Sequence, residues 1–315
     1  MYVVGIDAGG SKTVCQVGDE TGRVIAEARG SGANLQSAGE LEVEKVLHEV
    51  MTEALAGIGE SPAALCLGMA GVDRPNDARV MRGMLARLCR GSRALIVNDA
   101  LVALEAGAPD SPGIVIISGT GSIAYGRDAH GHAARAGGWG HVLGDEGSGF
   151  WLGRQALRAV LRAADHRGAR TELAPRIMAH FGVSREQDLV HPVYEGGMRP
   201  KAVAALASIV GDVADAGDHV AMHIVDIGAD ELASSAASVA RRLDLVDCQI
   251  PLPLAGGIFR AVPRVRTRVI ERLGELLPNA TPALLTAEPA SGAVRLAAAL
   301  LAGDVRVPVY LDATH

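Results

Sequence analysis

The fold is decided by residues 95–122, LIVNDALVALEAGAPDSPGIVIISGTGS. Two apolar runs frame this stretch, and each ends in a polar motif. The first run ends in Asn98-Asp99, which offers a carboxylate, and the second ends in the glycine-rich turn 118–122, which offers backbone N–H groups. Because α/β sheets place ligands beyond the carboxyl ends of their strands, we interpret the stretch as a proton acceptor and a phosphate cradle of one site.

Outward from this stretch, the sequence shows an internal repeat. The chain opens with a strand, a glycine-rich turn at 7–13, a returning strand and a second turn at 19–22. The same order returns with turns at 118–122 and 128–131. Aligned by their Gly-Ser dipeptides, the first turns are offset by 111 residues, and the second turns by 109. A repeat is stronger evidence than either motif alone, and it predicts two similar halves that each bring a glycine hairpin to a shared cleft.

The remaining pattern alternates strands with helices, which is typical of an α/β domain with a partly parallel sheet. The predicted strands are 2–6, 14–17, 23–28, 64–70, 94–97, 114–117, 123–126, 250–254 and 283–287. The predicted helices are 39–57, 76–88, 99–106, 150–164, most of 171–246, 263–276 and 291–302. The tail 305–315 gives no signal.

Length and composition limit the classes of protein. The 315 residues suggest two domains, and 49% hydrophobic with 21% charged residues is ordinary for a globular protein. The net charge of −6 argues against a general nucleic-acid surface. No uninterrupted apolar stretch approaches the roughly 20 residues of a membrane span, and no signal peptide is recognised at the start. We therefore expect a cytoplasmic protein with neither nucleic acid nor membrane as a partner.

The four cysteines, Cys15, Cys66, Cys89 and Cys248, are widely spaced and form no CxxC pair. Neither a zinc knuckle nor an iron–sulfur cradle within one chain is expected from this spacing. Cys15 and Cys66 lie in apolar runs and are interpreted as buried, reduced thiols.

The turn after the first strand could bind an anion. Gly9 and Gly10 allow close backbone approach, so that several N–H groups can form an anion nest. Ser11, Lys12 and Thr13 follow directly and add donors, and Asp7 at the strand end could hold Mg²⁺ through water. The alternative is a plain tight hairpin with a solvated lysine. The pattern is not a P-loop, because Ser11 separates the glycine from the lysine and a strand follows in place of a helix.

The second turn follows the same logic, with Gly119 and Gly121 as its glycines and the Thr120 hydroxyl as an added donor. The alternative is a polar hairpin turn, which the repeat makes less attractive. Asp99, just past a buried strand, could be a general base toward a substrate hydroxyl. Its alternative is purely structural, since Asn and Asp are the preferred N-cap residues of helices.

Two further glycine-rich segments are candidate binding loops. Residues 137–149, GGWGHVLGDEGSG, contain Trp139, which could be core or a stacking wall, and His141, which we interpret as a packing residue. Asp145 and Glu146 in the same loop could bind sugar hydroxyls or help with a metal. Ala255-Gly256-Gly257 follows a strand and could admit a flat ring or form a plain strand-to-helix turn.

Together these motifs resemble the sugar kinase/Hsp70/actin superfamily, and within it the N-acetylglucosamine kinase-like members of the BadF/BadG/BcrA/BcrD group. The resemblance rests on GIDAGGSKT at 5–13, ND at 98–99, ISGTGS at 117–122, GGWGHVLGDEGS at 137–148 and AGGIF at 255–259. It implies two ribonuclease-H-like (actin-like ATPase) domains with mixed sheets, 1–112 and 113–289, that clamp Mg-ATP between them. A C-terminal helix near 290–302 would pack back on the first domain.

The resemblance also implies roles for individual residues. Asp7 would orient Mg²⁺, and Asp99 would accept the proton of the sugar 6-hydroxyl. Asn34 and Asp145 would bind sugar hydroxyls, while Gly138 and Trp139 would line the 2-substituent. The phosphate and adenine contacts would come from Gly9, Gly10, Ser11, Lys12, Thr13, Gly119, Thr120, Gly121, Gly256 and Gly257.

The expected activity is an ATP-dependent amino-sugar kinase, with ATP and Mg²⁺, N-acetylglucosamine as acceptor and a homodimer as the assembly. Glucosamine kinase shares every motif, N-acetylmuramic acid is another possible acceptor, and a non-sugar ATPase or a non-catalytic ATP-binding regulator is the alternative from another class. The resemblance has departures too. The cysteines of the acyl-CoA dehydratase activators and the zinc motif of the ROK kinases are both missing from this sequence.

Overall fold

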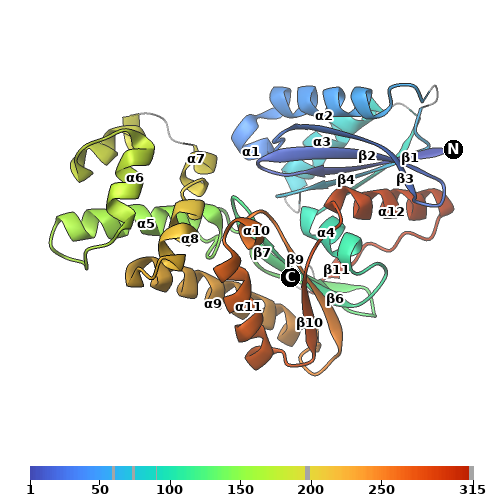
Figure 1. Ribbon diagram of the computed structural model, residues 1–315. Coiled ribbons are helices and arrows are strands. Elements are labelled where there is room, and N and C mark those ends of the chain that lie inside the picture. Colours follow the sequence, from blue (N-terminus) through green and yellow to red (C-terminus); the bar gives the residue numbers. More distant parts are fainter. Residues whose placement is uncertain (59–60, 73–74, 90, 196–198, 312–315) are drawn as a thin grey trace.

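The computed structural model describes residues 1–58, 61–72, 75–89, 91–195 and 199–311, and Figure 1 shows two sheets with helices around them. The first sheet has the strand order β3-β2-β1-β4-β5, and the second has the order β10-β9-β6-β7-β8-β11. Each sheet contains parallel and antiparallel pairs. The predicted α/β class with two mixed sheets is therefore confirmed, while the domain boundary at 112/113 stays a prediction.

The first sheet is buried on both faces, because successive apolar side chains of its strands point to opposite faces and helices cover each face. Val4 and Ile6 of β1 pack in a cluster with α2 and α3, whereas Val3 packs in another cluster with α4 and α12. The elements are β1 Tyr2–Ala8, β2 Lys12–Asp19, β3 Val24–Ser31, α1 Leu35–Ala38, α2 Glu40–Ala54, β4 Ala64–Met69, α3 Pro75–Leu88, β5 Arg93–Val97 and α4 Asp99–Gly107.

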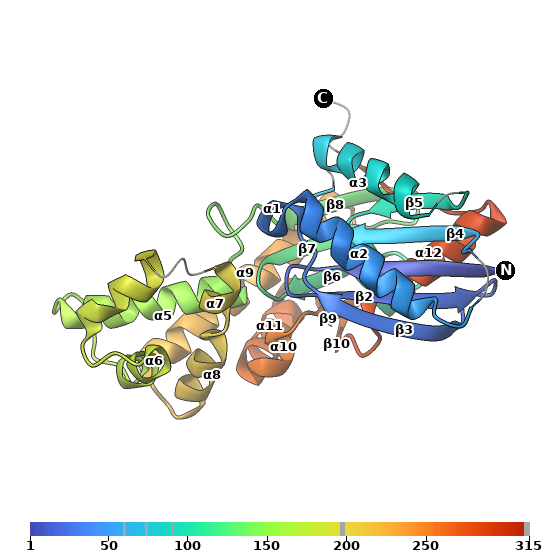
Figure 2. The same cartoon turned by 90° about the horizontal axis from the view of Figure 1, so that it is seen from above.

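The second sheet carries most of the helices, which extend to one side of the molecule (Figures 1 and 2). Its strands are β6 Gly113–Ser118, β7 Ser122–Arg127, β8 His132–Gly137, β9 Ile250–Ala255, β10 Ala280–Leu284 and β11 Val309–Tyr310. Its helices are α5 Gly149–Ala164, α6 Leu173–Phe181, α7 Pro200–Ala204, α8 Ala207–Asp215, α9 His219–Arg242, α10 Ile258–Ala261 and α11 Pro263–Leu276, and the chain continues into α12 Pro289–Ala302. A 3₁₀ turn, Glu186–Leu189, and a π turn, His191–Glu195, join α6 to α7.

Two helices lie between the sheets. Helix α12 packs on β1 and β4 of the first sheet and on α4, and α4 in turn contacts β6 and β7 of the second sheet. The approach of α12 to α4 requires glycine, because a Cβ on Gly292 would lie 2.0 Å from the carbonyl oxygen of Val102. The chain therefore returns to the first sheet after completing most of the second.

The internal repeat is visible in the backbone, but the offset of 111 for the first turns is wrong. Ala8 pairs with Thr13 across the first tip, and Ser118 pairs with Ser122 across the second. Residues 9–12 thus correspond to 119–121, so the second tip is shorter by one residue. The second turns match closely, since Asp19 and Asp128 each accept N–H groups two and four residues ahead.

Three strands differ from their predictions. The strand predicted at 283–287 lies at 280–284, where Pro282 is tolerated because β10 is an edge strand. Strand β8 was not predicted, and it completes the second three-stranded meander. The tail forms β11, which pairs with β8. Cys15 and Cys66 are buried free thiols, as predicted. Within the described residues, no helix has the length and apolar character that a membrane span needs.

Candidate active site

The first glycine tip lies between β1 and β2. The Gly9 N–H donates to the Lys12 carbonyl at 3.0 Å and closes the turn, while the Ala33 N–H donates to the Gly9 carbonyl at 3.1 Å. The second bond brings the loop that carries Asn34 beside the tip. At Gly10 a Cβ would meet nothing within 4 Å. The protein itself therefore does not demand glycine at this position, and the open space is available to a ligand.

Lys12 is held at this tip by an acidic residue that sequence reasoning did not single out. The Lys12 ammonium lies 2.8 Å from one carboxylate oxygen of Glu288, and the Arg29 guanidinium lies 2.9 Å from the other. Glu288 is the residue before α12, where a negative charge is favoured by the helix dipole. For Lys12 to bind a phosphate, it must leave Glu288 or be shared with it.

Two carboxylates meet at the carboxyl ends of the parallel strands. Asp7 is near the end of β1, and Asp99 begins α4 directly after β5 and Asn98. Burial, and after it the negative charges of Asp99 and Glu288, raise the pKa of Asp7 to about 7 against the opposing charge of Lys12. Asp7 and Asp99 are therefore close enough for each to feel the charge of the other.

The Asn98-Asp99 pair stands at the start of α4. The N-cap of α4 is Asn98, whose side-chain oxygen accepts the Ala100 N–H at 2.9 Å. Asp99 is the first residue of the helix, and its side chain is partly exposed. The N-cap role, which was the structural alternative for Asp99, is therefore filled by Asn98.

The second tip is fixed by the start of α5. The carbonyl of Gly119 accepts the Gly149 N–H at 2.8 Å, and the carbonyl of Thr120 accepts the Phe150 N–H at 3.3 Å. The backbone N–H of Gly119 bonds to the Gly121 carbonyl at 2.9 Å. A Cβ on Gly119 would meet nothing within 4 Å. This tip, like the first, has an open glycine face.

Asp145 is part of the scaffold of the second tip. It is buried at 7% exposure, and it accepts the backbone N–H groups of Ser122 and Gly140. Burial raises its pKa, and these hydrogen bonds oppose the rise. Gly121 is needed here because a Cβ would lie 2.7 Å from an Asp145 carboxylate oxygen. As a sugar ligand, Asp145 would have only its remaining lone pairs to offer.

Trp139 extends from the same loop and is 61% exposed. One face of its ring is covered by the Arg135 guanidinium, whose central carbon lies 4.5 Å from the ring centroid. The Gly138 N–H donates to the Ser122 carbonyl at 3.0 Å and ties this segment to β7. Trp139 is therefore a surface ring and not core.

Gly256 and Gly257 lie beside the second tip because β9 runs parallel to β6. Gly256 has φ 99°, and a Cβ there would lie 2.1 Å from the Ser118 carbonyl oxygen. At Gly257 a Cβ would meet nothing within 4 Å. Gly256 is therefore required by its positive φ and its close approach to Ser118, whereas Gly257 leaves open space next to the second tip.

The two tips meet. The hydroxyls of Ser11 and Thr120 are hydrogen-bonded at 2.8 Å, and the Lys201 ammonium reaches the Ser11 carbonyl at 3.5 Å. The first tip thus carries Asp7, Asp99 and Asn34 around it, and the second carries the 256–257 turn and the 137–149 loop. Sequence reasoning missed Lys201 and Glu288, because only the fold brings them to the tip.

The charge at Asp7 has a measurable consequence for stability. Between its ordinary pKa near 4 and about 7, the folded protein binds more protons than the unfolded chain, so the free energy of unfolding falls as the pH rises. We expect Asp7→Asn to stabilise the ligand-free protein by ~2 kcal/mol at pH 8 and to change little at pH 4. Urea unfolding at both pH values measures this difference.

Asp19→Asn is the matched control. The pKa of Asp19 is lowered, first by the hydrogen bond from the Thr21 hydroxyl. Its loss should therefore destabilise the protein above pH 4, which is the opposite direction. An Asp7→Asn variant that is less stable than the unmodified protein at pH 8 would contradict the assignment.

The neighbouring glycines give a second prediction. Gly256→Ala should lower the free energy of unfolding by at least ~2 kcal/mol, because it combines a positive φ with a backbone clash. Gly257→Ala should leave stability within ~0.5 kcal/mol but weaken nucleotide binding, because the methyl group fills the open space. Thermal unfolding and calorimetric ATP titration separate the two effects. Equal stability losses in the two variants would show that Gly256 and Gly257 do not differ in their structural role.

Two sheets whose glycine hairpins meet tip to tip, with carboxylates beside one tip, define the class of actin-like sugar kinase folds. The chain belongs to the BadF/BadG/BcrA/BcrD ATPase family, whose model matches residues 4–297.

Named relatives and solved structures agree with this family. The chain is 37% identical over 264 residues to an N-acetylmuramic acid/N-acetylglucosamine kinase of Clostridium acetobutylicum, covering 83% of this chain and 86% of that protein. It is 31% identical over 308 residues to an N-acetyl-D-glucosamine kinase of Dictyostelium discoideum, covering 93% and 97%. A solved structure from Chromobacterium violaceum, assigned as an N-acetylglucosamine kinase, matches with a TM-score of 0.77 and 26% identity, covering 95% of this chain and 98% of that chain.

Proposed function

We propose that this protein is an ATP-dependent kinase that phosphorylates the 6-hydroxyl of an amino sugar, with N-acetylglucosamine as the acceptor. The observation that carries the proposal is the contact of the two tips at Ser11 and Thr120, next to the carboxylates Asp7 and Asp99. Phosphoryl transfer needs positioning and charge neutralisation more than covalent chemistry, and this arrangement provides both.

The tips fit the phosphates of ATP. Gly10 and Gly119 both have open space where a side chain would stand, which is the cradle that a phosphate chain needs. Lys12 and Lys201 stand at the first tip as cations. Gly257 would leave room for the adenine. We assign Gly9, Ser11, Thr120 and Gly121 to the same phosphate contacts, as the resemblance implies. Thr13 is fully buried and its hydroxyl donates to the Ser31 carbonyl at 2.8 Å, so it supports the tip from inside.

The environment of Asp7 fits Mg²⁺. Burial, followed by the negative charges of Asp99 and Glu288, raises the pKa of Asp7 to about 7. A divalent cation would relieve this repulsion and neutralise phosphate charge when bound. Among the described residues, no group of three or more metal-ligating side chains gathers. Asp7 would therefore hold the ion mainly through water, which Mg²⁺ retains readily.

Asp99 is the proposed general base. It lies in the first turn of α4, where the helix dipole favours a negative charge. It would accept the proton of the 6-hydroxyl as the new bond to phosphorus forms. Asn34, Asp145 and the Gly138–Trp139 segment would orient the sugar, and closure of the two sheets on each other would exclude water as a competing acceptor.

The acceptor is proposed from two relatives, one named as an N-acetylmuramic acid/N-acetylglucosamine kinase and the other as an N-acetyl-D-glucosamine kinase. A coupled assay of ADP release tests it with N-acetylglucosamine, glucosamine, N-acetylmuramic acid and no sugar. We expect release to be stimulated most by N-acetylglucosamine. A higher kcat/KM with glucosamine would favour the alternative acceptor, and ATP hydrolysis that no sugar stimulates would favour a non-sugar ATPase.

A further inference from the structure

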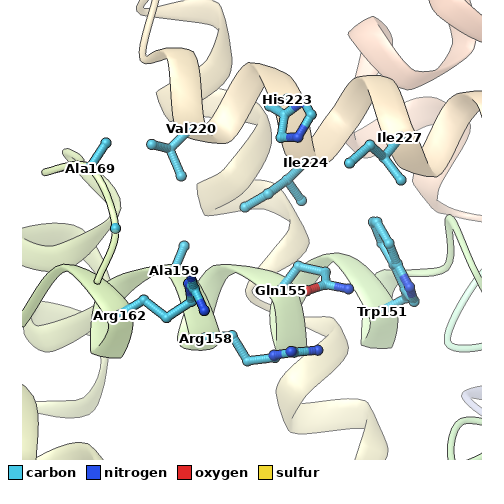
Figure 3. Close-up of a pocket in the computed structure, with 11 residues that line it drawn as sticks. Trp151, Gln155, Arg158, Ala159, Arg162, Ala169, Val220, His223, Ile224 and Ile227 are labelled. Carbon is cyan, nitrogen blue, oxygen red and sulfur yellow. The ribbon is translucent and has the colours of Figure 1, made fainter. Parts of the chain in front are cut away.

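A trough opens between α5 and α9, outside the tips and loops described above (Figure 3). Its cavity volume is about 390 Å³. Helix α5 forms one wall, helix α9 forms the other, and the loop after α5 closes one end. The lining residues are Trp151, Gln155, Arg158, Ala159, Arg162, Gly168, Ala169, Val220, His223, Ile224 and Ile227.

The charged side chains that line the trough are all positive. None of its lining residues is acidic, and Arg158 and Arg162 stand one turn apart on α5. Within the described part of the chain, the Arg158 guanidinium has no hydrogen-bond or ion-pair partner, while Arg162 donates to the Arg167 carbonyl at 2.9 Å. His223 lies across from them on α9 (Figure 3). In a protein of net charge −6, this basic edge attracts an anion.

The interior of the trough is apolar. Trp151 and Ile224 are nearly buried at 6% and 7% exposure, and Ile227 is 38% exposed. Gln155 adds one amide side chain to the lining. A ligand that matches both features has an apolar body on the floor and an anionic head at the arginines. A sugar phosphate fits less well, because its hydroxyls would face aliphatic side chains.

The floor of the trough is connected to the second tip. Trp151 is in the first turn of α5, and the N–H groups of Gly149 and Phe150 in the same turn hold the Gly119 and Thr120 carbonyls. A Cβ on Gly228 of α9 would lie 3.3 Å from the Trp151 ring. A ligand that shifts Trp151 would therefore act on the segment that fixes the tip.

We propose that the trough binds a small organic anion with an apolar body, whose carboxylate or phosphate head pairs with Arg158 and Arg162, and that its binding changes the affinity of the second tip for ATP. The second half rests on the proposed function, whereas the first half does not. Guanidinium groups suit both kinds of head, because they donate two parallel hydrogen bonds to either.

The test uses a matched series of six-carbon probes: hexanoate, hexyl phosphate, hexan-1-ol and hexylamine. Trp139 and Trp151 are the two tryptophans of the chain, so Trp139→Phe leaves Trp151 as the reporter of the trough. We expect its fluorescence to respond to at least one anion with a Kd at least ~10-fold below those of the alcohol and the amine, because a hydrogen bond to a charged group contributes that much. Comparison of the two anions identifies the preferred head.

The variants decide whether the arginines are responsible. In the double variant Arg158→Gln/Arg162→Gln the advantage of the anions should disappear, whereas Arg185→Gln, which removes an exposed arginine outside the trough, should keep it. Ala159→Phe, which fills the trough from the α5 side, should block all four probes. Anion binding no tighter than that of the alcohol, or unchanged in the double variant, would overturn the site.

Calorimetric ATP titration of the unmodified protein, with and without the bound anion, measures the coupling. We expect the Kd for ATP to change by at least ~3-fold, and the same factor should appear in the Kd for the anion, because coupling is reciprocal. An unchanged Kd would overturn the coupling. Failure to bind ATP at all would overturn the proposed function, and the fluorescence test would still decide the site.

Discussion

Asp99→Asn is expected to lower kcat for N-acetylglucosamine phosphorylation by about 10²–10⁴-fold, which is the range for loss of a general base. Asparagine keeps the shape of the side chain but cannot accept the hydroxyl proton. The phosphate-binding groups lie on the two tips and are untouched, so the Kd for ATP should change by no more than a few fold. Steady-state kinetics and calorimetric ATP titration together separate chemistry from binding.

Asn98→Ala is the matched control, because it removes the cap and leaves the base. Loss of the bond from the Ala100 N–H should cost about 1 kcal/mol of stability. The activity of this variant should fall far less than that of Asp99→Asn at a temperature where both are folded. If Asp99→Asn keeps the kcat of the unmodified protein, Asp99 is not the base, and its position at the start of α4 is only structural.

The second large effect is expected for the buried ion pair between α4 and the second sheet. Glu105 and Arg127 are 2% and 8% exposed and lie 2.6 Å apart. Arg127 also donates to the carbonyls of Ser111 and Ala108, both at 2.9 Å. Glu105→Ala leaves the guanidinium buried without its counter-charge. We expect a loss of about 3–5 kcal/mol in the free energy of unfolding, measured by urea unfolding.

The double replacement Glu105→Leu/Arg127→Met tests the cause of that loss. Because it removes both charges and keeps volume, it should cost much less than Glu105→Ala alone. Arg87→Ala provides a surface comparison, since the Arg87 ion pair with Glu44 is exposed and should contribute little to stability. Comparable losses in the single and double variants would mean that packing, not uncompensated charge, dominates at this position.

The strands that the sequence predicted correctly are those whose pattern is local. The hairpin around each glycine tip follows from short-range backbone bonds, such as the bond from Gly9 to Lys12. The same holds for the Asp19 and Asp128 turns, whose side chains bond to their own backbone. Strand β10 was misplaced because Pro282 is acceptable only at a sheet edge, and edge position is a property of the whole sheet.

In the candidate site, too, local features were predicted from the sequence and long-range contacts were not. The residue types at the tips indicated phosphate binding, and the open faces of Gly10 and Gly119 agree with that prediction. The partners of these residues could not be predicted. Lys12 pairs with Glu288 across 276 residues of sequence, and no local pattern indicates such a pair. Asp145 stays a predicted sugar ligand, but its hydrogen bonds with the backbone of Ser122 and Gly140 were not predicted from the sequence.

The sequence by itself determined the two glycine tips, the acidic pair that starts α4 and the alternation of strands and helices, because each depends on neighbours along the chain. Only the tertiary structure decided that the tips meet at Ser11 and Thr120, that Glu288 holds Lys12, and that a basic trough lies between α5 and α9. Those features depend on through-space electrostatics and packing between segments that are distant in sequence, and such contacts exist only once both sheets have formed.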